Sequence, residues 1–128
     1  YIYRMEVISV GTLYYDKDTT PPSISDIRVT SNSEGYEIKC TVSDNVGVTK
    51  VSFPTWTNNN GQDDLIWHEG TITGNTAVCW IPRSQHNNEA GVYTTHVYAY
   101  DQIGNNSSGG ISMKIGTPTS FDVNFILD

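Results

Sequence analysis

The chain has 128 residues, enough for one domain with a buried core. It carries 14 Asp and Glu residues against 7 Lys and Arg residues, and a net charge of -7 is repelled by nucleic-acid phosphates and by anionic lipid. The sequence therefore predicts no nucleic-acid binding and, because no apolar run approaches the roughly 20 residues needed to cross a bilayer, no membrane insertion.

The beginning of the chain is expected to lie outside the main domain. Residues 1–15 alternate apolar and polar side chains, a pattern typical of a β-strand. Residues 19–22 (Thr-Thr-Pro-Pro) predict a stiff linker, because proline lacks the backbone N–H that sheets require. We therefore expect residues 1–20 to be a leader strand and linker at the edge of a preceding unit. Because the sequence starts at Tyr1 rather than Met, we also expect it to be part of a longer protein.

The middle of the chain has the pattern of an all-β fold. Short runs of β-branched and aromatic residues alternate with clusters of Gly, Asn, Asp and Pro, and no apolar repeat of helical period is sustained. About seven short strands predict a β-sandwich. The expected strands cover residues 24–30, 36–43, 48–55, 64–69, 76–82, 91–100 and 110–116.

Two cysteines, Cys40 and Cys79, fall at inward-facing positions of alternating runs. Their number permits one disulfide but does not require it, and their spacing fits no zinc motif. Two buried free thiols that behave as small apolar side chains fit the pattern equally well. The sequence leaves both alternatives open.

Two turns share the pattern Asp-x-aliphatic-Gly, at residues 44–47 and 101–104. In such a turn we expect the Asp carboxylate to accept backbone N–H bonds and the Gly to take a positive φ. The aliphatic residues, Val46 and Ile103, are expected to plug the end of the core.

The same turns suggest a cation site. In an immunoglobulin-like sandwich the first strand begins at the end where these two turns lie, so four carboxylates are expected to converge there: Asp16, Asp18, Asp44 and Asp101. Carboxylate oxygens suit Ca²⁺, which is the one cofactor that the sequence suggests. The alternative is that these residues only cap turns, since no segment has the Asp-x-Asp-x-Asp-Gly pattern of a calcium loop.

The end of the chain resembles its beginning. A second alternating run, residues 121–127, follows Thr117 and Pro118. We expect residues 117–128 to be a linker and strand leading to a following unit, which leaves residues 21–116 as the domain. Two alternatives stay open, because the runs at the two ends can also pair with each other or with the sandwich.

Three segments carry a resemblance to a known family. A Phe-Pro-x-Trp segment at residues 53–56 is followed by Gly-Gln-Asp-Asp at residues 61–64 and by Trp67. A further segment, Gly-Val-Tyr-Thr-Thr-His-Val-Tyr, stands at residues 91–98. Together they resemble the GBS Bsp-like repeat of secreted and surface-attached proteins of Gram-positive bacteria, over roughly Pro21 to Ser108.

The resemblance implies a non-catalytic, extracellular module with an immunoglobulin-like antiparallel β-sandwich of about seven strands. Such repeats often stand beside cell-wall hydrolase domains, but the resemblance names no ligand. His68 departs from the family pattern, in which we expect an aromatic residue after Trp67.

Tryptophans and an oxygen-rich loop suggest glycan binding. Indole rings stack on sugar rings, while neighbouring amides and carboxylates bind sugar hydroxyls. Trp67 shares parity with Leu65 and is expected to enter the core. The residues expected to bind a ligand are Trp56, Gln62, Asp63, Asp64 and Trp80. The alternative is that the tryptophans fill the core or cover strands and that the loop at residues 58–64 is a tight connection.

No sequence pattern of a hydrolase or a phosphate-binding loop is present, so we expect no enzyme. The expected function is that of a monomeric accessory module of a secreted or cell-surface protein. It would bind peptidoglycan or another surface glycan and so position a neighbouring domain. A structural spacer without a ligand is the alternative. The acidic charge favours a neutral glycan over polyanionic teichoic acid.

Overall fold

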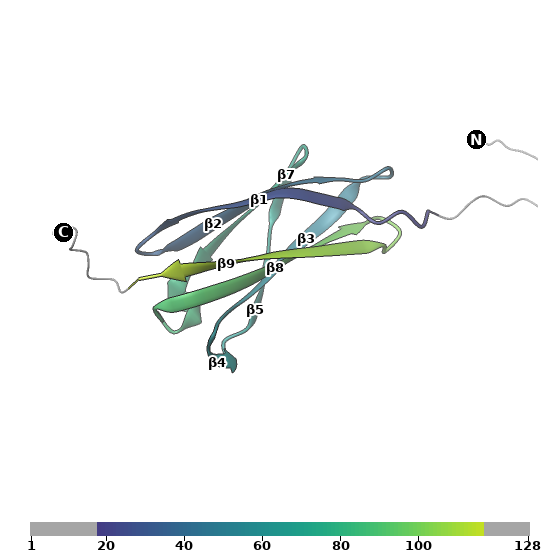
Figure 1. Ribbon diagram of the computed structural model, residues 1–128. Coiled ribbons are helices and arrows are strands. Elements are labelled where there is room, and N and C mark those ends of the chain that lie inside the picture. The colour runs from purple at the N-terminus through teal and green to yellow at the C-terminus, as the bar shows by residue number, and fades with distance from the viewer. Residues whose placement is uncertain (1–17, 117–128) are drawn as a thin grey trace, which may run out of the picture.

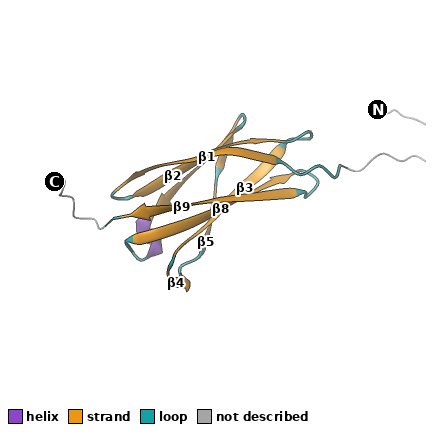
Figure 2. Cartoon of the chain, viewed as in Figure 1, coloured by secondary structure: helices purple, strands orange, loops and turns teal. Residues whose placement is uncertain are grey.

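The computed structural model describes residues 18–116, which form a sandwich of two four-stranded antiparallel sheets (Figure 1). The strand order is β1-β2-β7-β6 in the first sheet and β5-β3-β8-β9 in the second. Between residues 18 and 116 the one helical element is a single 3-10 turn, η1 (Figure 2). The bounds are β1 (Ser23–Asn32), β2 (Gly35–Ser43), β3 (Val48–Thr57), β4 (Asn59–Gln62), β5 (Ile66–Glu69), β6 (Thr71–Thr73), β7 (Thr76–Pro82), η1 (Arg83–His86), β8 (Gly91–Asp101) and β9 (Asn106–Ile115).

The strand order is that of an immunoglobulin-like sandwich. Such a fold places its first, second, fifth and fourth strands in one sheet and its third, sixth and seventh in the other. Here β1, β2, β7 and β6 take the first set of places, and β3, β8 and β9 take the second, with β5 added beside β3. The predicted all-β, immunoglobulin-like antiparallel sandwich is confirmed.

The structure corrects the fourth expected strand, at residues 64–69. Most of that run forms β5, which pairs with β3, whereas the fourth place of the first sheet is taken by the three-residue strand β6. The chain crosses between the sheets at Gly70, whose N–H donates to the Val51 carbonyl oxygen at 2.9 Å. A Cβ atom there would lie 2.3 Å from Cε1 of Phe53, so the close crossing needs glycine. A strand as short as β6 carries too little pattern to be predicted from sequence.

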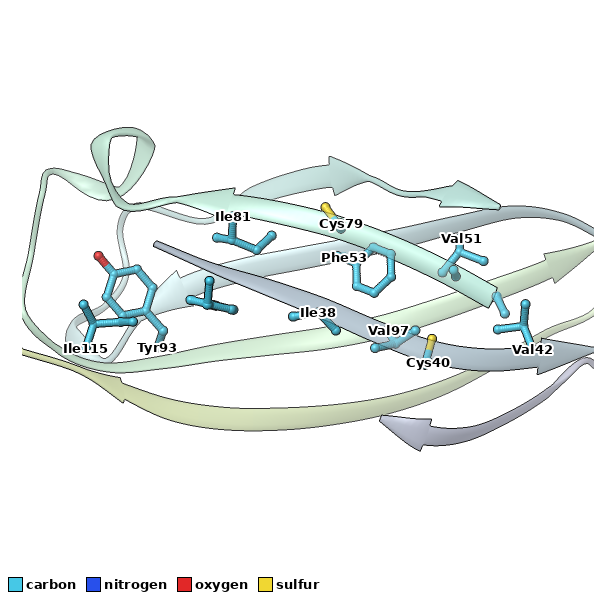
Figure 3. Packing of buried hydrophobic residues seen from close by; sticks show 13 residues of the cluster. Ile38, Cys40, Val42, Val51, Phe53, Cys79, Ile81, Tyr93, Val97 and Ile115 are labelled. Atoms are coloured by element: carbon cyan, nitrogen blue, oxygen red, sulfur yellow. The ribbon is translucent and has the colours of Figure 1, made fainter. Parts of the chain in front are cut away.

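The core lies between the two sheets and is built from alternate residues of their strands (Figure 3). A buried hydroxyl network crosses it, because the Tyr36 hydroxyl lies 2.6 Å from Oγ1 of Thr95, which lies 2.8 Å from Oγ1 of Thr55. Burial raises the pKa of Tyr36 to about 12. The buried apolar residues are Tyr36, Ile38, Cys40, Val42, Val51, Phe53, Ala77, Cys79, Ile81, Tyr93, Val97, Ala99 and Ile115.

Cys40 and Cys79 are buried free thiols. They lie on adjacent strands but not opposite each other, since Cys40 pairs with Ala77 and Cys79 pairs with Ile38. Burial raises the pKa of both thiols, that of Cys79 to about 12. Of the two alternatives left open by the sequence, the structure therefore has free thiols that pack as small apolar side chains.

The chain enters and leaves the sandwich at opposite ends (Figure 1). β1 and β9 begin near each other, because the Ser107 hydroxyl donates to the Pro22 carbonyl oxygen at 2.6 Å. The alternating runs at residues 1–15 and 121–127 lie outside the described residues, so their pairing stays a prediction. Within residues 18–116 no helix is long and apolar enough to cross a membrane.

Candidate functional site

The outer face of the second sheet carries a group of aromatic side chains. In β8 the odd-numbered side chains from Tyr93 to Asp101 are buried, so the even-numbered ones face outward. Paired residues of adjacent strands face the same side, and Trp56 of β3 pairs with Thr94 of β8. Trp67 of β5 pairs with Pro54 of β3 and faces outward as well. We call this set the aromatic face: Trp56, Trp67, His96, Tyr98 and Tyr100.

Four rings of the aromatic face form a continuous series over three strands. The ring centroids of Trp67 and Tyr98 lie 5.4 Å apart, those of Tyr98 and His96 lie 6.4 Å apart, and those of His96 and Trp56 lie 5.0 Å apart. These separations are typical of interacting aromatic pairs. The series therefore forms a joined surface rather than four isolated rings.

Small and polar residues border this surface. Gly110 of β9 pairs with His96, and a Cβ atom at Gly110 would lie 3.1 Å from Cδ2 of the His96 ring, so the glycine lets that ring lean over β9. On the other side, Nζ of Lys50 lies 3.6 Å from a carboxylate oxygen of Glu69 and 5.5 Å from the centroid of the Tyr100 ring. The charge of this lysine is thus partly balanced by its neighbours.

The expectation that Trp67 enters the core is wrong. Its side chain is 54% exposed. The expectation rested on shared parity with Leu65, but Leu65 is itself 37% exposed, so the two side chains both face outward. In β5 the residues that face inward are Ile66 and His68.

Trp80 is exposed as expected, but it lies on the opposite side of the domain from Trp56. It belongs to β7 and pairs with Glu37 of β2, on the outer face of the first sheet. The structure therefore does not bring these two tryptophans together. Gln62 and Asp63 are exposed at the end of β4 and in the turn that follows.

Asp64 is turned inward and is 8% exposed. Both of its carboxylate oxygens accept the Thr57 N–H at 3.1 Å, and Oδ2 lies 2.8 Å from Nδ1 of the buried His86. Burial would raise the pKa of Asp64, but the hydrogen bonds from His86 and Thr57 outweigh it and lower the pKa. The carboxylate of Asp64 is thus occupied by partners within the domain.

A second histidine extends this buried contact toward the surface. Nε2 of His68 lies 3.0 Å from Nε2 of His86, so Asp64, His86 and His68 form a chain of hydrogen-bonded groups. Burial and the adjacent His86 ring lower the pKa of His68 to about 4. Nothing in the sequence pattern indicated this chain, because His86 lies 22 residues from Asp64 and 18 residues from His68.

The end of the sandwich near η1 is held by a buried arginine that sequence reasoning missed. The Arg83 guanidinium donates to the carbonyl oxygens of Ser33 and Gly116 at 3.2 and 2.9 Å, and to those of Asn88 and Glu89 at 3.1 and 3.0 Å. These bonds join three parts of the chain at one point, namely the turn after β1, the stretch from η1 to Glu89 and the end of β9. The arrangement is structural and lies away from the aromatic face.

The structure brings three of the predicted aspartates together at the end where β1 begins. Each of Asp18, Asp44 and Asp101 offers an oxygen within 4.8 Å of the others, whereas Asp16 lies outside the described residues. Oδ1 of Asp101 accepts the backbone N–H groups of Ile103, Gly104 and Asn105, each at 2.9 Å.

The two predicted turns form as expected in most respects. Asp44 and Asp101 accept backbone N–H bonds from the residue two positions later, and both turn glycines have a positive φ. However, Val46 and Ile103 do not plug the core, because their side chains are 43% and 47% exposed. The buried residue of the second turn is instead Asp101, which is 3% exposed.

Comparison with known proteins connects the chain to one family. The family model of the GBS Bsp-like repeat matches residues 27–113, more than half of the chain. No curated protein matches. Among solved structures, the PKD1 domain of Vibrio anguillarum Epp is similar, with a TM-score of 0.47 and 12% identity, covering 79% of this chain and 100% of that domain. On the family match, the chain belongs to the GBS Bsp-like repeats.

Proposed function

We propose that this repeat is an extracellular module that binds a neutral glycan, such as the sugar chains of peptidoglycan, on its aromatic face. The observation that carries the proposal is the continuous series of rings formed by Trp67, Tyr98, His96 and Trp56 on the outside of one sheet. In this function the module positions a neighbouring domain against the cell wall. Of the residues expected from the sequence, Trp56 belongs to this site.

The chemistry of the aromatic face fits a sugar chain. An exposed indole loses unfavourable contact with water when an apolar face of a sugar ring stacks on it. Hydroxyl groups lie beside the rings. Thr94 pairs with Trp56 on the neighbouring strand, and Oγ1 of Thr94 lies 3.1 Å from the Ser112 hydroxyl. Such groups can exchange hydrogen bonds with sugar hydroxyls.

The shape of the surface favours an extended ligand. The described part of the chain has no pocket. A small metabolite is usually bound in a concave cavity, whereas a polymer can gain affinity by lying along a flat series of rings. Trp67 and Trp56 stand at the two ends of such a series, so successive sugars would contact different rings.

Charge supports a neutral ligand. The chain carries a net charge of -7, and Lys50 at the margin of the aromatic face is paired with Glu69. A polyanion would meet repulsion from the whole domain at low salt. We therefore expect binding to depend little on salt concentration.

A structural spacer is the second candidate. One observation favours it, namely that the chain enters and leaves the sandwich at opposite ends, which suits units joined in series (Figure 1). In this function the aromatic face would have no ligand of its own.

The deciding experiment is retention of the purified domain on insoluble peptidoglycan from which teichoic acid has been removed. The variant Trp67→Ala is compared with Trp80→Ala, since both remove an exposed tryptophan but from opposite faces. We expect the wild type and Trp80→Ala to be retained and Trp67→Ala to be lost. Equal retention of both variants would show that the aromatic face is not the site. Absence of retention for the wild type at high loading would favour the spacer.

A further inference from the structure

We propose that Asp18, Asp44 and Asp101 bind a calcium ion at the end of the sandwich where β1 begins. The three residues come from three distant segments, namely the chain ahead of β1, the turn after β2 and the end of β8. Their oxygens nevertheless lie within 4.8 Å of one another. This site is separate from the aromatic face and does not depend on glycan binding.

A buried oxygen without a partner points to a ligand at this place. Oδ2 of Asp44 accepts the Val46 N–H at 3.0 Å, but Oδ1 of Asp44 is fully buried and accepts no hydrogen bond. A buried carboxylate oxygen without a hydrogen-bond donor is costly, and native structures rarely leave one in that state. A cation at the cluster would supply the missing partner.

Side-chain cations do not balance the cluster. Within residues 18–116 the ion pairs are formed by Arg28, Lys39, Lys50 and His86, and none of them involves the three aspartates. Neutral amides stand there instead. Nδ2 of Asn105 lies 3.1 Å from Oδ2 of Asp18 and 2.9 Å from Oδ2 of Asp101. An amide dipole offsets only part of three negative charges.

The spacing and the donor types fit calcium. Ca²⁺ binds six to eight oxygens at about 2.3–2.6 Å, so oxygens on opposite sides of the ion lie about 4.6–5.2 Å apart. The three aspartate oxygens lie no more than 4.8 Å from one another, so they can share one such ion. Mg²⁺ binds at about 2.0–2.1 Å and demands a stricter octahedron, which makes it the poorer fit. Zinc prefers nitrogen and sulfur ligands, and the cluster contains neither His nor Cys.

The donors needed beyond the carboxylates are at hand. The Asp18 carbonyl oxygen lies 3.0 Å from Nδ2 of Asn105, at the edge of the cluster. Rotation of the Asn105 amide by a half turn would direct its oxygen toward the ion, and water would complete the shell. Binding would tie the segment ahead of β1 to the turns that follow β2 and β8.

The test measures calcium binding by calorimetry and thermal unfolding in EDTA, Ca²⁺ and Mg²⁺. The informative variant is Asp44→Asn, which keeps an acceptor for the Val46 N–H but removes one charge. Asp63→Asn is the matched control, because it makes the same change at an exposed position. For the wild type and the control we expect one saturable Ca²⁺ site and a melting temperature that rises with Ca²⁺ more than with Mg²⁺.

Asp44→Asn is expected to weaken calcium binding on the order of tenfold or more. In EDTA the same variant is expected to melt no lower than the wild type, because it relieves a buried unpaired oxygen and reduces repulsion. A wild type that shows neither heat of binding nor a melting shift in millimolar Ca²⁺ would overturn the proposal. So would an Asp44→Asn variant that binds like the wild type. Asp18→Asn, in the segment ahead of β1, provides a second variant should Asp44→Asn fail to fold.

Discussion

The rings of Trp67 and Tyr98 lie 5.4 Å apart, although the strands that carry them are separated by β3. Between them β3 presents Ser52, which pairs with Tyr98, and Pro54, which pairs with Trp67. These two side chains are short, so the large rings can meet above the intervening strand. The contact therefore depends on the packing of β5, β3 and β8 in one sheet, although these strands are not consecutive in the chain.

This pair should be measurable as a coupling. We expect the unfolding free energies of Trp67→Ala, Tyr98→Ala and the double variant to give an interaction energy of about 0.5–1.5 kcal/mol, because tilted aromatic pairs contribute that much beyond burial. Urea unfolding of the four proteins measures it. The cycle of Trp80→Ala with Tyr98→Ala is the control and should be additive, since Trp80 lies on the other sheet. A coupling of zero for the first pair would contradict the arrangement.

Two adjacent aspartates, Asp63 and Asp64, should differ in how much stability the same substitution removes. Asp64→Ala leaves the buried Thr57 N–H and His86 without their acceptor, so we expect a loss of about 2–4 kcal/mol of unfolding free energy. Asp63→Ala removes an exposed carboxylate and should change stability by no more than about 0.5 kcal/mol. Chemical denaturation of both variants provides the comparison. Equal effects would mean that Asp64 is not buried as described.

His68 should make the domain less stable in mild acid. Its pKa is lowered from 6.5 to about 4 in the folded state, so between these pH values the unfolded chain binds more protons. Stability therefore falls as the pH drops from about 6.5 to about 4. We expect a loss of about 1–2 kcal/mol across this range, allowing for the partial exposure of the ring. The lowered pKa of Asp64 adds a further loss when that carboxyl becomes protonated at lower pH.

The control for this pH effect is His68→Gln, which keeps a donor for His86 but does not titrate. Urea unfolding at several pH values between 7 and 4 should show a shallower slope for the variant than for the wild type. Parallel curves would assign the pH dependence to other groups.

Arg83 should be sensitive even to a conservative change. Arg83→Lys retains the charge but cannot reach all four carbonyl oxygens, so buried acceptors lose their donors and we expect a loss of about 2–4 kcal/mol. Arg28→Lys is the matched control, because Arg28 forms an exposed ion pair with Asp26 and should contribute little. Thermal unfolding of both variants tests this. Similar melting temperatures for the two variants would contradict the role of Arg83.

The features of the fold that could be predicted from the sequence are those determined by residues close together in the chain. The alternation of Tyr36, Ile38, Cys40 and Val42 predicted an inward row in β2, and the structure buries all four. The Tyr93 hydroxyl donates to the Glu89 carbonyl oxygen four residues earlier at 2.7 Å, a local contact typical of the tyrosine corner of such sandwiches. In both cases the information lies within a few residues.

The misplaced residues depend on partners that are distant in the sequence. Trp67 faces outward because of its register with Pro54, and Asp64 is buried because His86 comes to it from η1. β9 was predicted to start at residue 110 but starts at Asn106, since Gly109 and its serine neighbours carry no strand pattern. A Cβ atom at Gly109 would lie 3.0 Å from Cδ1 of Ile27. The missing side chain at Gly109 therefore leaves room for Ile27 of β1 to pack against β9.

The opposite exits of the chain determine how the domain would respond to a pull along its length. Among residues 18–116, β1 pairs only with β2 and β9 pairs only with β8, and these two outer strands run in the same direction (Figure 1). Tension applied through residues 18 and 116 would slide each outer strand along its neighbour. All the hydrogen bonds of a ladder then share the load and must break together, rather than one after another. Such a geometry resists mechanical extension of the domain along its length.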